Sequence, residues 1–286
     1  MKWRGGRRSS NIEDRRGVRP RSGLVGGGLG TIVIILAALY FGIDPSFLIE
    51  GMQSSNVSPS SAGTNLSAED LKNDPLADMV AVVIGDTEEV WHALFAEMGR
   101  RYEEPTLVLF TGATRSACGT GQAAMGPFYC PADHKAYIDL SFYDDMRTRY
   151  RAPGDFAQAY VIAHEIGHHV QNLLGISSEV RKMQSRTSKA DGNRLSVKLE
   201  LQADCLAGVW ANRADEARSI LETGDVDEAL NAASAIGDDR LQKQGRGTVV
   251  PESFTHGTSE QRQRWFKTGL LSGNPDSCDT FGAASL

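Results

Sequence analysis

The sequence predicts a mainly helical α+β domain with a small antiparallel or mixed sheet, preceded by a single transmembrane helix. Three observations support this fold class. Long stretches in the second half carry apolar residues at helical spacing, and short stretches in the first half alternate as strands do. Residues 23–43 form an uncharged run of 21 residues. That is about the length that crosses a bilayer as a helix, roughly 20 residues.

The N-terminal segment, residues 1–23, is a basic head with eight Lys and Arg side chains against two acidic ones. Basic flanks stay on the cytoplasmic side, so we expect a cytoplasmic head and a translocated remainder. A buried soluble helix or a cleaved signal peptide would also explain an apolar run. The long head and the lack of an A-x-A site after the run favour an uncleaved transmembrane helix over residues 24–43.

Residues 44–76 are rich in Ser, Asn, Gly and Pro and are predicted to be a flexible linker. Residues 77–286 are then the folded domain. The whole chain has a net charge of −6 although its head is basic, so the remainder is acidic. This charge argues against nucleic acid as the main partner.

Within the domain, the pattern predicts a helix after Pro75 with a possible break near Gly85, followed by strands at "PTLVLF" and "KAYIDLSFY". A helix of about twenty residues should begin near Asp155, as a cap, and end at Gly175. A second amphipathic helix is expected at "LSVKLELQADCLAGVWANRA", with two or three more helices after it.

Three histidines and a glutamate lie within six positions of the stretch "AYVIAHEIGHHVQN". Helix positions i and i+4 are about 40° apart around the axis, so His164 and His168 face the same way and can bind one metal ion. His169 lies about 140° from His164, and we expect a bystander, core or capping residue. Glu165 can reach a metal-bound water, as the general base does in the H-E-x-x-H pattern of zinc hydrolases.

A catalytic zinc ion needs a third protein ligand and an open fourth position. Glu200 is predicted to be that ligand, with Asp204 one turn later accepting a hydrogen bond from a ligand histidine. The reverse assignment of these two carboxylates stays open. The alanines and leucines around them argue against a merely solvated acidic face.

The stretch "SFTHGTSEQRQRWF" offers two further site candidates. His256 is predicted to donate a hydrogen bond to the oxyanion of a tetrahedral intermediate. Arg262 could instead hold the carboxylates of the site in place. Four other residues carry weaker signals and are expected to be structural: Tyr137, Tyr160, His92 and His134.

An even number of cysteines in a translocated domain predicts two disulfides. We expect Cys118 to pair with Cys130 and Cys205 with Cys278. Other pairings, or four buried thiols, remain alternatives. The spacing lacks the close C-x-x-C that cysteine ligation of zinc requires.

Five blocks of the sequence resemble the bacterial neutral zinc metallopeptidases of the YpfJ type. They are "KWRGGRRSSNIEDRRG", "ACGTGQAAMGPFYCPAD", "AYVIAHEIGHHVQNLLG", "ELQADCLAGVWA" and "SFTHGTSEQRQRWF". They extend over nearly the whole chain apart from the linker. The resemblance implies a single-span zinc peptidase in the bacterial inner membrane, with its catalytic domain outside the cytoplasm.

A more distant likeness is to the membrane-linked zinc peptidases of the HtpX group. Glu200, Ala203 and Asp204 match their order and spacing, as do Thr255, His256 and Arg262, while Gly257 and Thr258 replace a proline and a serine. The likeness implies a zincin-type fold, in which an active-site helix lies beside an edge strand that holds extended peptide. By this analogy "KAYIDLSF" would be that strand.

The sequence therefore predicts a membrane-anchored peptidase with one zinc ion per chain, a protein or peptide substrate, and a lipid bilayer as a further partner. A zinc amidase acting on cell-wall peptides would share this chemistry. The competing class is a non-catalytic scaffold with a structural zinc site. Glu165 argues against it, because a closed structural site has no use for a general base.

Overall fold

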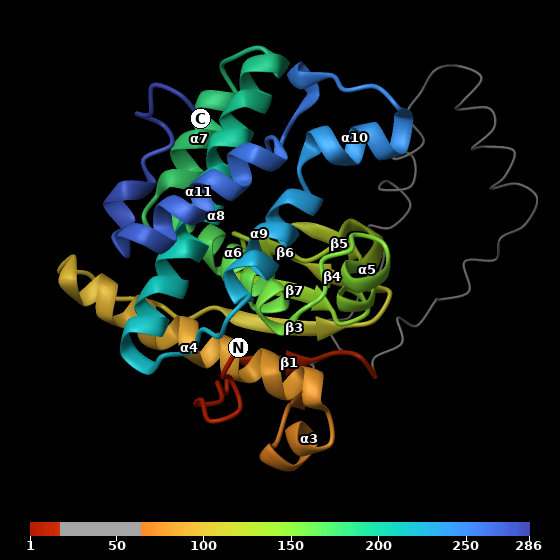
Figure 1. Cartoon of the computed structure of the whole chain (residues 1–286), viewed down its shortest axis with the longest axis vertical. Coiled ribbons are helices and arrows are strands. Elements are labelled where there is room, and N and C mark those ends of the chain that lie inside the picture. Colours follow the sequence, from red (N-terminus) through yellow and green to blue (C-terminus); the bar gives the residue numbers. More distant parts are fainter. Residues whose placement is uncertain (18–63) are drawn as a thin grey trace, which may run out of the picture. The chain divides into compact units, whose positions relative to one another are not determined.

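The computed structural model describes residues 1–17 and 64–286 of the chain. Its strands form a mixed five-stranded sheet, in the order β2-β1-β3-β7-β6, and a separate hairpin of β4 and β5 (Figure 1). The strands are β1 (Ile12–Asp14), β2 (Thr64–Asn65), β3 (Thr106–Phe110), β4 (Ala113–Ser116), β5 (Gly119–Gln122), β6 (Phe128–Cys130) and β7 (Lys135–Asp139). The pairs β1–β3 and β3–β7 are parallel, and the two outer pairs are antiparallel.

Helices make up most of the described chain. They are α3 (Ala68–Lys72), α4 (Pro75–Glu97), α5 (Phe142–Thr148), α6 (Asp155–Leu173), α7 (Ile176–Gln184), α8 (Lys189–Arg218), α9 (Asp225–Ala235), α10 (Asp238–Arg246) and α11 (Ser259–Ser272). The predicted α+β class, mainly helical with a small mixed sheet, is confirmed.

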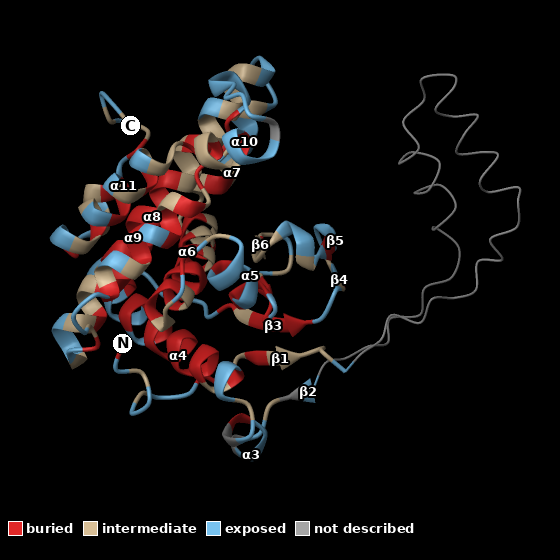
Figure 2. Cartoon of the chain, turned by 45° about the vertical axis from the view of Figure 1, so that its right-hand side comes forward, coloured by how far each residue is buried: buried red, intermediate tan, exposed pale blue. Residues whose placement is uncertain are grey.

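The buried residues gather along α4, α6 and α8 (Figure 2). Helix α4 begins where Asp74 accepts a hydrogen bond from the backbone of Ala77 and a proline occupies the first turn. It continues without the predicted break at Gly85. Helix α8 packs against both α6 and α11, and Trp210 of α8 stacks on Phe156 of α6 at 6.0 Å between ring centroids.

The N-terminal segment, residues 1–17, is part of this domain. Strand β1 lies between β2 and β3, and Ile12 is 3% exposed. The guanidinium of Arg7 donates to the buried carboxylate of Glu88 at 2.6 Å. The segment crosses α4 at Gly85, where any Cβ would lie 2.4 Å from the Arg7 carbonyl oxygen. Glycine is therefore required there for the segment and the helix to touch.

This arrangement differs from the predicted domain boundaries. The sequence separates a basic head, residues 1–23, from a domain that starts at residue 77, but residues 1–17 contribute a strand to the sheet of that domain. The predicted linker, residues 44–76, also contains β2 and α3. Arg7, Arg8 and Arg16 are paired with acids of α4 and of its N-cap, which a charge count along the sequence does not reveal.

The predicted transmembrane helix, residues 24–43, lies outside the described residues. Within residues 1–17 and 64–286, no helix combines the length and the apolar character that a membrane crossing requires.

The α-ammonium group of Met1 lies in a cluster of carboxylates beside the start of α6. It donates to Asp155 at 2.6 Å and to Asp225 at 3.3 Å. Burial opposes the charge, but these carboxylates outweigh it and raise the pKa of the ammonium. Asp155 is the first helical residue and not the predicted cap, a position that Gly154 occupies.

Both disulfides match the predicted pairing. Cys118–Cys130 joins the turn between β4 and β5 to strand β6. Cys205–Cys278 joins α8 to the C-terminal segment.

Strand β7 is not the edge strand that the sequence analysis expected. It pairs with β3 on one side and with β6 on the other, so β6 is the terminal strand of the described sheet. The chain turns back after Cys130, and Phe128 stacks on Tyr137 of β7 at 4.7 Å between ring centroids. Tyr137 is accordingly buried, at 1% exposure.

Candidate metal-dependent active site

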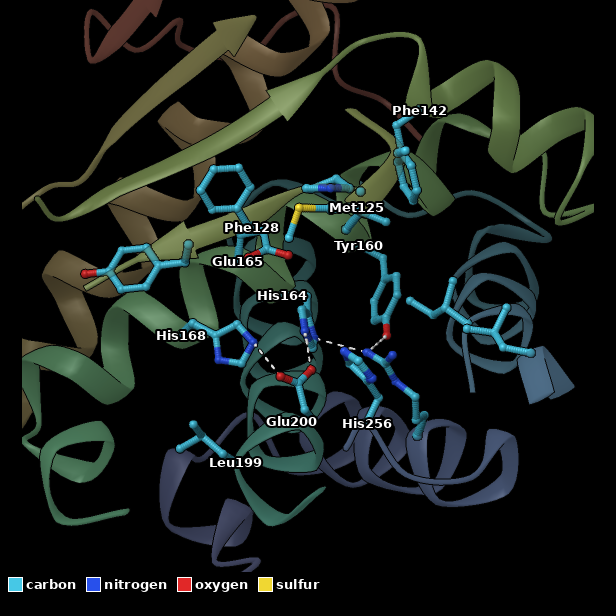
Figure 3. Close-up of a pocket in the computed structure, with 18 of the residues that line it drawn as sticks. Met125, Phe128, Phe142, Tyr160, His164, Glu165, His168, Leu199, Glu200 and His256 are labelled. Atoms are coloured by element: carbon cyan, nitrogen blue, oxygen red, sulfur yellow. Dashed lines mark hydrogen bonds and ion pairs between the residues drawn. The ribbon is translucent and has the colours of Figure 1, made fainter. Parts of the chain in front are cut away.

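Helices α6 and α8 bring together three side chains that can bind a metal ion. In Figure 3 the side chains of His164 and His168 point toward Glu200. His164 Nε2 lies 3.2 Å from Glu200 Oε2, and His168 Nε2 lies 3.4 Å from Glu200 Oε1. One ligand atom from each residue lies within 4.8 Å of the others.

This convergence depends on the close approach of α6 to α8. A Cβ at position 167, between the two histidines, would lie 2.9 Å from the carbonyl oxygen of Ala203 and 3.1 Å from its Cα. Backbone atoms cannot move out of the way as a flexible side chain can. Gly167 therefore lets the helices touch at the level of the histidines, and Glu200 of α8 reaches both rings.

The first histidine is held by a buried acidic residue. His164 Nδ1 donates to Asp204 Oδ1 at 2.8 Å, and the hydroxyl of Tyr160 donates to the same oxygen at 2.5 Å. Arg262 is 1% exposed and donates to both carboxylate oxygens of Asp204, at 2.8 and 2.9 Å. Four donated hydrogen bonds therefore compensate for the burial of one carboxylate. Tyr160, expected to be structural, belongs to this network.

The second histidine is held by an amide that the sequence analysis missed. His168 Nδ1 donates to the side-chain oxygen of Gln171 at 2.9 Å. Gln171 donates in turn to the carbonyl of Leu199 and to the side chain of Gln202 on α8. The sequence does contain a signal for this contact: Gln171 follows His168 by three residues, and residues at i and i+3 are neighbours on a helix surface.

These contacts fit a tetrahedral zinc site. Each histidine has its Nδ1 proton committed to an oxygen acceptor, so each Nε2 can offer a lone pair to a metal. Zinc–ligand bonds of about 2.0–2.1 Å in a tetrahedron separate the ligand atoms by roughly 3.3 Å. The two observed separations, 3.2 Å to Oε2 and 3.4 Å to Oε1 of Glu200, are close to that spacing. Three protein ligands leave a fourth position for water or substrate.

The electrostatics of the site also favour a cation. Burial opposes charge on the rings, but Asp204 and Glu200 outweigh it and raise the pKa of His164 to about 10. Glu200 likewise raises the pKa of His168 despite burial. The pKa of Glu200 is lowered well below its usual value, because both imidazoles outweigh its burial. The pocket therefore binds positive charge, as a proton or as a metal ion.

A cavity of about 490 Å³ opens beside these residues. Glu165 and His256 line it together with the three candidate ligands and with the chain just before and within β6. Glu165 lies on the side of the metal site toward Phe128 (Figure 3). Burial raises the pKa of Glu165, which moves this carboxyl toward the range of a general base or acid.

The predicted oxyanion donor, His256, has a partner that was not predicted. Its Nδ1 lies 3.2 Å from Asp238 Oδ1, the first residue of α10. Asp238 Oδ2 also accepts from the backbone of Thr255, His256 and Gly257 at 2.6–3.1 Å, so it fixes the loop. Hydrogen bonding to Asp238 raises the pKa of His256.

The other histidines lie away from the metal ligands. His169 is fully buried and hydrogen-bonded to Tyr129 and to a backbone carbonyl. Burial lowers the pKa of His169 to about 4, so its ring is neutral. His92 pairs with Glu104 at 2.8 Å on the surface. The ring of His134 packs beside His169.

Two histidines one helical turn apart, a glutamate next to the first, and a carboxylate from a second helix match the pattern of a candidate metal site of the HExxH class. A family profile described as "Putative neutral zinc metallopeptidase" matches residues 1–281. The chain belongs to this family, whose description names zinc, and His164, His168 and Glu200 are the candidate residues to hold that metal.

The chain is similar to two groups of bacterial relatives. It is 51% identical to the "Uncharacterized protein YpfJ" of Escherichia coli (strain K12) over 293 residues, which cover 99% of both chains. It is 44% identical to an uncharacterized protein of Mycobacterium tuberculosis (strain H37Rv) over 195 residues, 65% of each chain. No solved structure matches the chain.

Proposed function

We propose that the protein is a zinc-dependent peptidase in which His164, His168 and Glu200 hold the metal and Glu165 is the general base. A bound zinc ion supplies a Lewis acid that lowers the pKa of water toward 7 and polarises the scissile carbonyl. The observation that carries the proposal is the convergence of three donor groups, at 3.2 and 3.4 Å, beside a glutamate that lines the same cavity.

Glu165 takes a proton from the attacking water and returns it to the leaving amine. Its raised pKa suits both steps, because a base poised nearer neutrality can also act as an acid. Asp204, Tyr160 and Arg262 act through His164, although Tyr160 and Arg262 also line the cavity. They hold the His164 ring in one tautomer and orientation, and so direct its Nε2 at the metal position.

His256 stabilises the oxyanion of the tetrahedral intermediate. Its Nδ1 is directed at Asp238, and the raised pKa favours the imidazolium, whose Nε2–H is then a donor. Both residues lie outside the metal-binding helices, on the loop before α11 and at the start of α10.

The substrate is a peptide or protein segment in extended conformation. Support comes from strand β6, the terminal strand of the described sheet, because Phe128 and Tyr129 line the cavity. An extended segment can add to such an edge through main-chain hydrogen bonds.

The central test replaces Glu165 by glutamine in the full chain. Zinc content by metal analysis should stay at one per chain, and cleavage of a proteome-derived peptide library should fall by about 10²- to 10⁴-fold. Glu179→Gln on the exposed face of α7 is the matched control and should cleave as the parent does. A parallel digest of cell-wall peptide fragments separates peptidase from amidase.

Two results would contradict the proposal. Equal cleavage by the parent and the Glu165→Gln protein would remove Glu165 as the base. A parent protein that binds zinc and cleaves neither substrate mixture would favour a non-catalytic zinc-binding scaffold.

We further propose that residues 1–17 and 64–286 work on the same side of the membrane, outside the cytoplasm. The support is that β1 pairs with β3 in parallel register, Ile12 with Leu107 and Asp14 with Leu109. Strands separated by a bilayer cannot share a hydrogen-bonded sheet. Two disulfides support an oxidising compartment. Membrane attachment through residues 24–43 stays a prediction.

Cysteine labelling tests this topology. Gly5→Cys and Leu271→Cys place thiols at exposed positions of the N-terminal segment and of α11. In right-side-out vesicles, an impermeant maleimide should label both. Labelling of position 271 alone would support the topology predicted from the sequence, in which the chain crosses the membrane once and its N-terminal head is cytoplasmic. Labelling of both only after permeabilisation would place the domain in the cytoplasm.

A further inference from the structure

The third histidine of the motif, His169, ties the active-site helix to the edge of the sheet. Its side chain is 0% exposed. On one side, Nε2 lies 2.6 Å from the carbonyl oxygen of Glu103, and on the other, Nδ1 lies 2.9 Å from the hydroxyl of Tyr129. Asn172, also on α6, lies 3.2 Å from the same hydroxyl.

One assignment of protons satisfies the whole chain of contacts. A carbonyl oxygen only accepts, so Nε2 of His169 carries the proton and donates to Glu103. Nδ1 then accepts from the Tyr129 hydroxyl, whose oxygen accepts from the amide of Asn172. The imidazole therefore has one tautomer and one orientation, and Tyr129 has its hydroxyl held by two residues of α6.

Tyr129 is the middle residue of β6, the terminal strand of the described sheet. Its neighbours are held by other means, since Phe128 stacks on Tyr137 and Cys130 is in a disulfide. These neighbours fix β6 to the sheet and to the β4–β5 turn. Among the described contacts, the hydroxyl of Tyr129 fixes β6 to the helix that carries the metal ligands.

We propose that His169 is a positioning residue, which holds the cavity-lining segment and β6, residues 123–130, at a set distance from the metal-binding face of α6. That distance decides whether a peptide paired with the strand edge presents its scissile bond at the metal, since misplacement of reacting groups by about 1 Å can cost 10²-fold in rate. The consequence for substrate rests on the proposed peptidase function. The role in positioning does not.

Two substitutions of His169 separate its two hydrogen bonds. Asparagine places an oxygen near the position of Nδ1 and keeps an acceptor for Tyr129, whereas glutamine reaches toward Glu103 and loses that acceptor. Tyr129→Phe removes the same bond from the other partner. Tyr102→Phe is the matched control, because Tyr102 packs its ring on His169 at 5.6 Å but its buried hydroxyl has no partner among the described residues.

The first measurement is hydrogen–deuterium exchange of the full chain, which needs no activity. His169→Gln and Tyr129→Phe should speed exchange in residues 123–130 by about fivefold, as the loss of one hydrogen bond implies. Exchange in α11 should not change. His169→Asn and Tyr102→Phe should match the parent. Equal exchange in all four variants, or faster exchange in α11 as well, would overturn the positioning role.

The second measurement uses a peptide that the parent protein cleaves, identified from the library digest. His169→Gln and Tyr129→Phe should lower kcat/KM by about three- to tenfold for that peptide, and less for a truncated version that pairs less with β6. Zinc content should stay unchanged. Equal losses of kcat/KM for both peptides would reject the substrate consequence. An inactive parent would reject the peptidase function, while the exchange result still decides the role of His169.

Discussion

Replacing Arg262 by methionine should lower the free energy of unfolding by about 3–5 kcal/mol, because it leaves a buried carboxylate without its cation. The partner carboxylate, Asp204, is 0% exposed, and Arg262 is 1% exposed. The guanidinium donates to both oxygens, and neither group has access to bulk water that could replace the lost partner. Tyr160 and His164 still donate to Asp204 in the variant, but neither replaces the two hydrogen bonds that the guanidinium donates to this carboxylate.

The same reasoning fixes the pH dependence. Burial raises the pKa of Asp204, but Arg262 and His164 outweigh it and hold the pKa at about 2. Since this lies below the unfolded value of 3.8, the stabilisation is complete above pH 3.8 and is lost as the pH falls toward 2. Without Arg262 the pKa rises, so acid unfolding of the variant should begin at a higher pH.

Urea denaturation followed by circular dichroism measures the effect, with excess EDTA in every sample so that metal binding does not contribute. Arg264→Met, at an exposed position of the same helix, is the control and should change stability by less than about 0.5 kcal/mol. Adding Asp204→Leu to Arg262→Met should recover part of the loss. A loss below about 1 kcal/mol for Arg262→Met would refute the buried-pair argument.

Three further predictions follow from the fold. Zinc at about 1,000 times its Kd should stabilise the EDTA-treated protein by about 4 kcal/mol in thermal denaturation, and a His168→Ala variant should lose this stabilisation. Ile12→Ala in β1 should cost about 2–4 kcal/mol in urea, whereas Leu76→Ala at an exposed position should cost little; equal effects would contradict the burial of β1. Removing the disulfide Cys205–Cys278, whose cysteines are 73 positions apart, should cost about 4 kcal/mol if the disulfide acts by restricting the unfolded chain. Removing Cys118–Cys130, whose cysteines are 12 positions apart, should cost about 3 kcal/mol, and the opposite order would argue against this explanation.

The sequence was most informative where the relevant geometry is local. Helical periodicity puts His164 and His168 on one face, and the structure places their Nε2 atoms 3.2 and 3.4 Å from the carboxylate of Glu200. The i, i+4 spacing likewise predicted that Glu200 and Asp204 share one face of a helix, and in the structure both carboxylates contact His164 from α8. These relations depend on 3.6 residues per turn and on little else.

Long-range relations were not readable in the same way. Strand β1 has three residues, too few for a period-two pattern, and its partners lie far along the chain. The sequence of a basic N-terminal segment does not reveal whether its charges face solvent or pair with buried acids. Arg7, for example, donates to the buried carboxylate of Glu88. The bond between His169 and Tyr129 joins a helix to a strand forty residues earlier, and no spacing rule connects them.

The pairing of Ile12 with Leu107 also sets an order of events during biosynthesis. Strand β1 leaves the ribosome before β3, and it can pair with this parallel neighbour only after nearly a hundred further residues have been made. Until β1 pairs with β3, that side of β3 is an open strand edge. A nascent chain whose N-terminus is retained elsewhere would keep that edge unpaired, which makes it a target for proteolysis and aggregation.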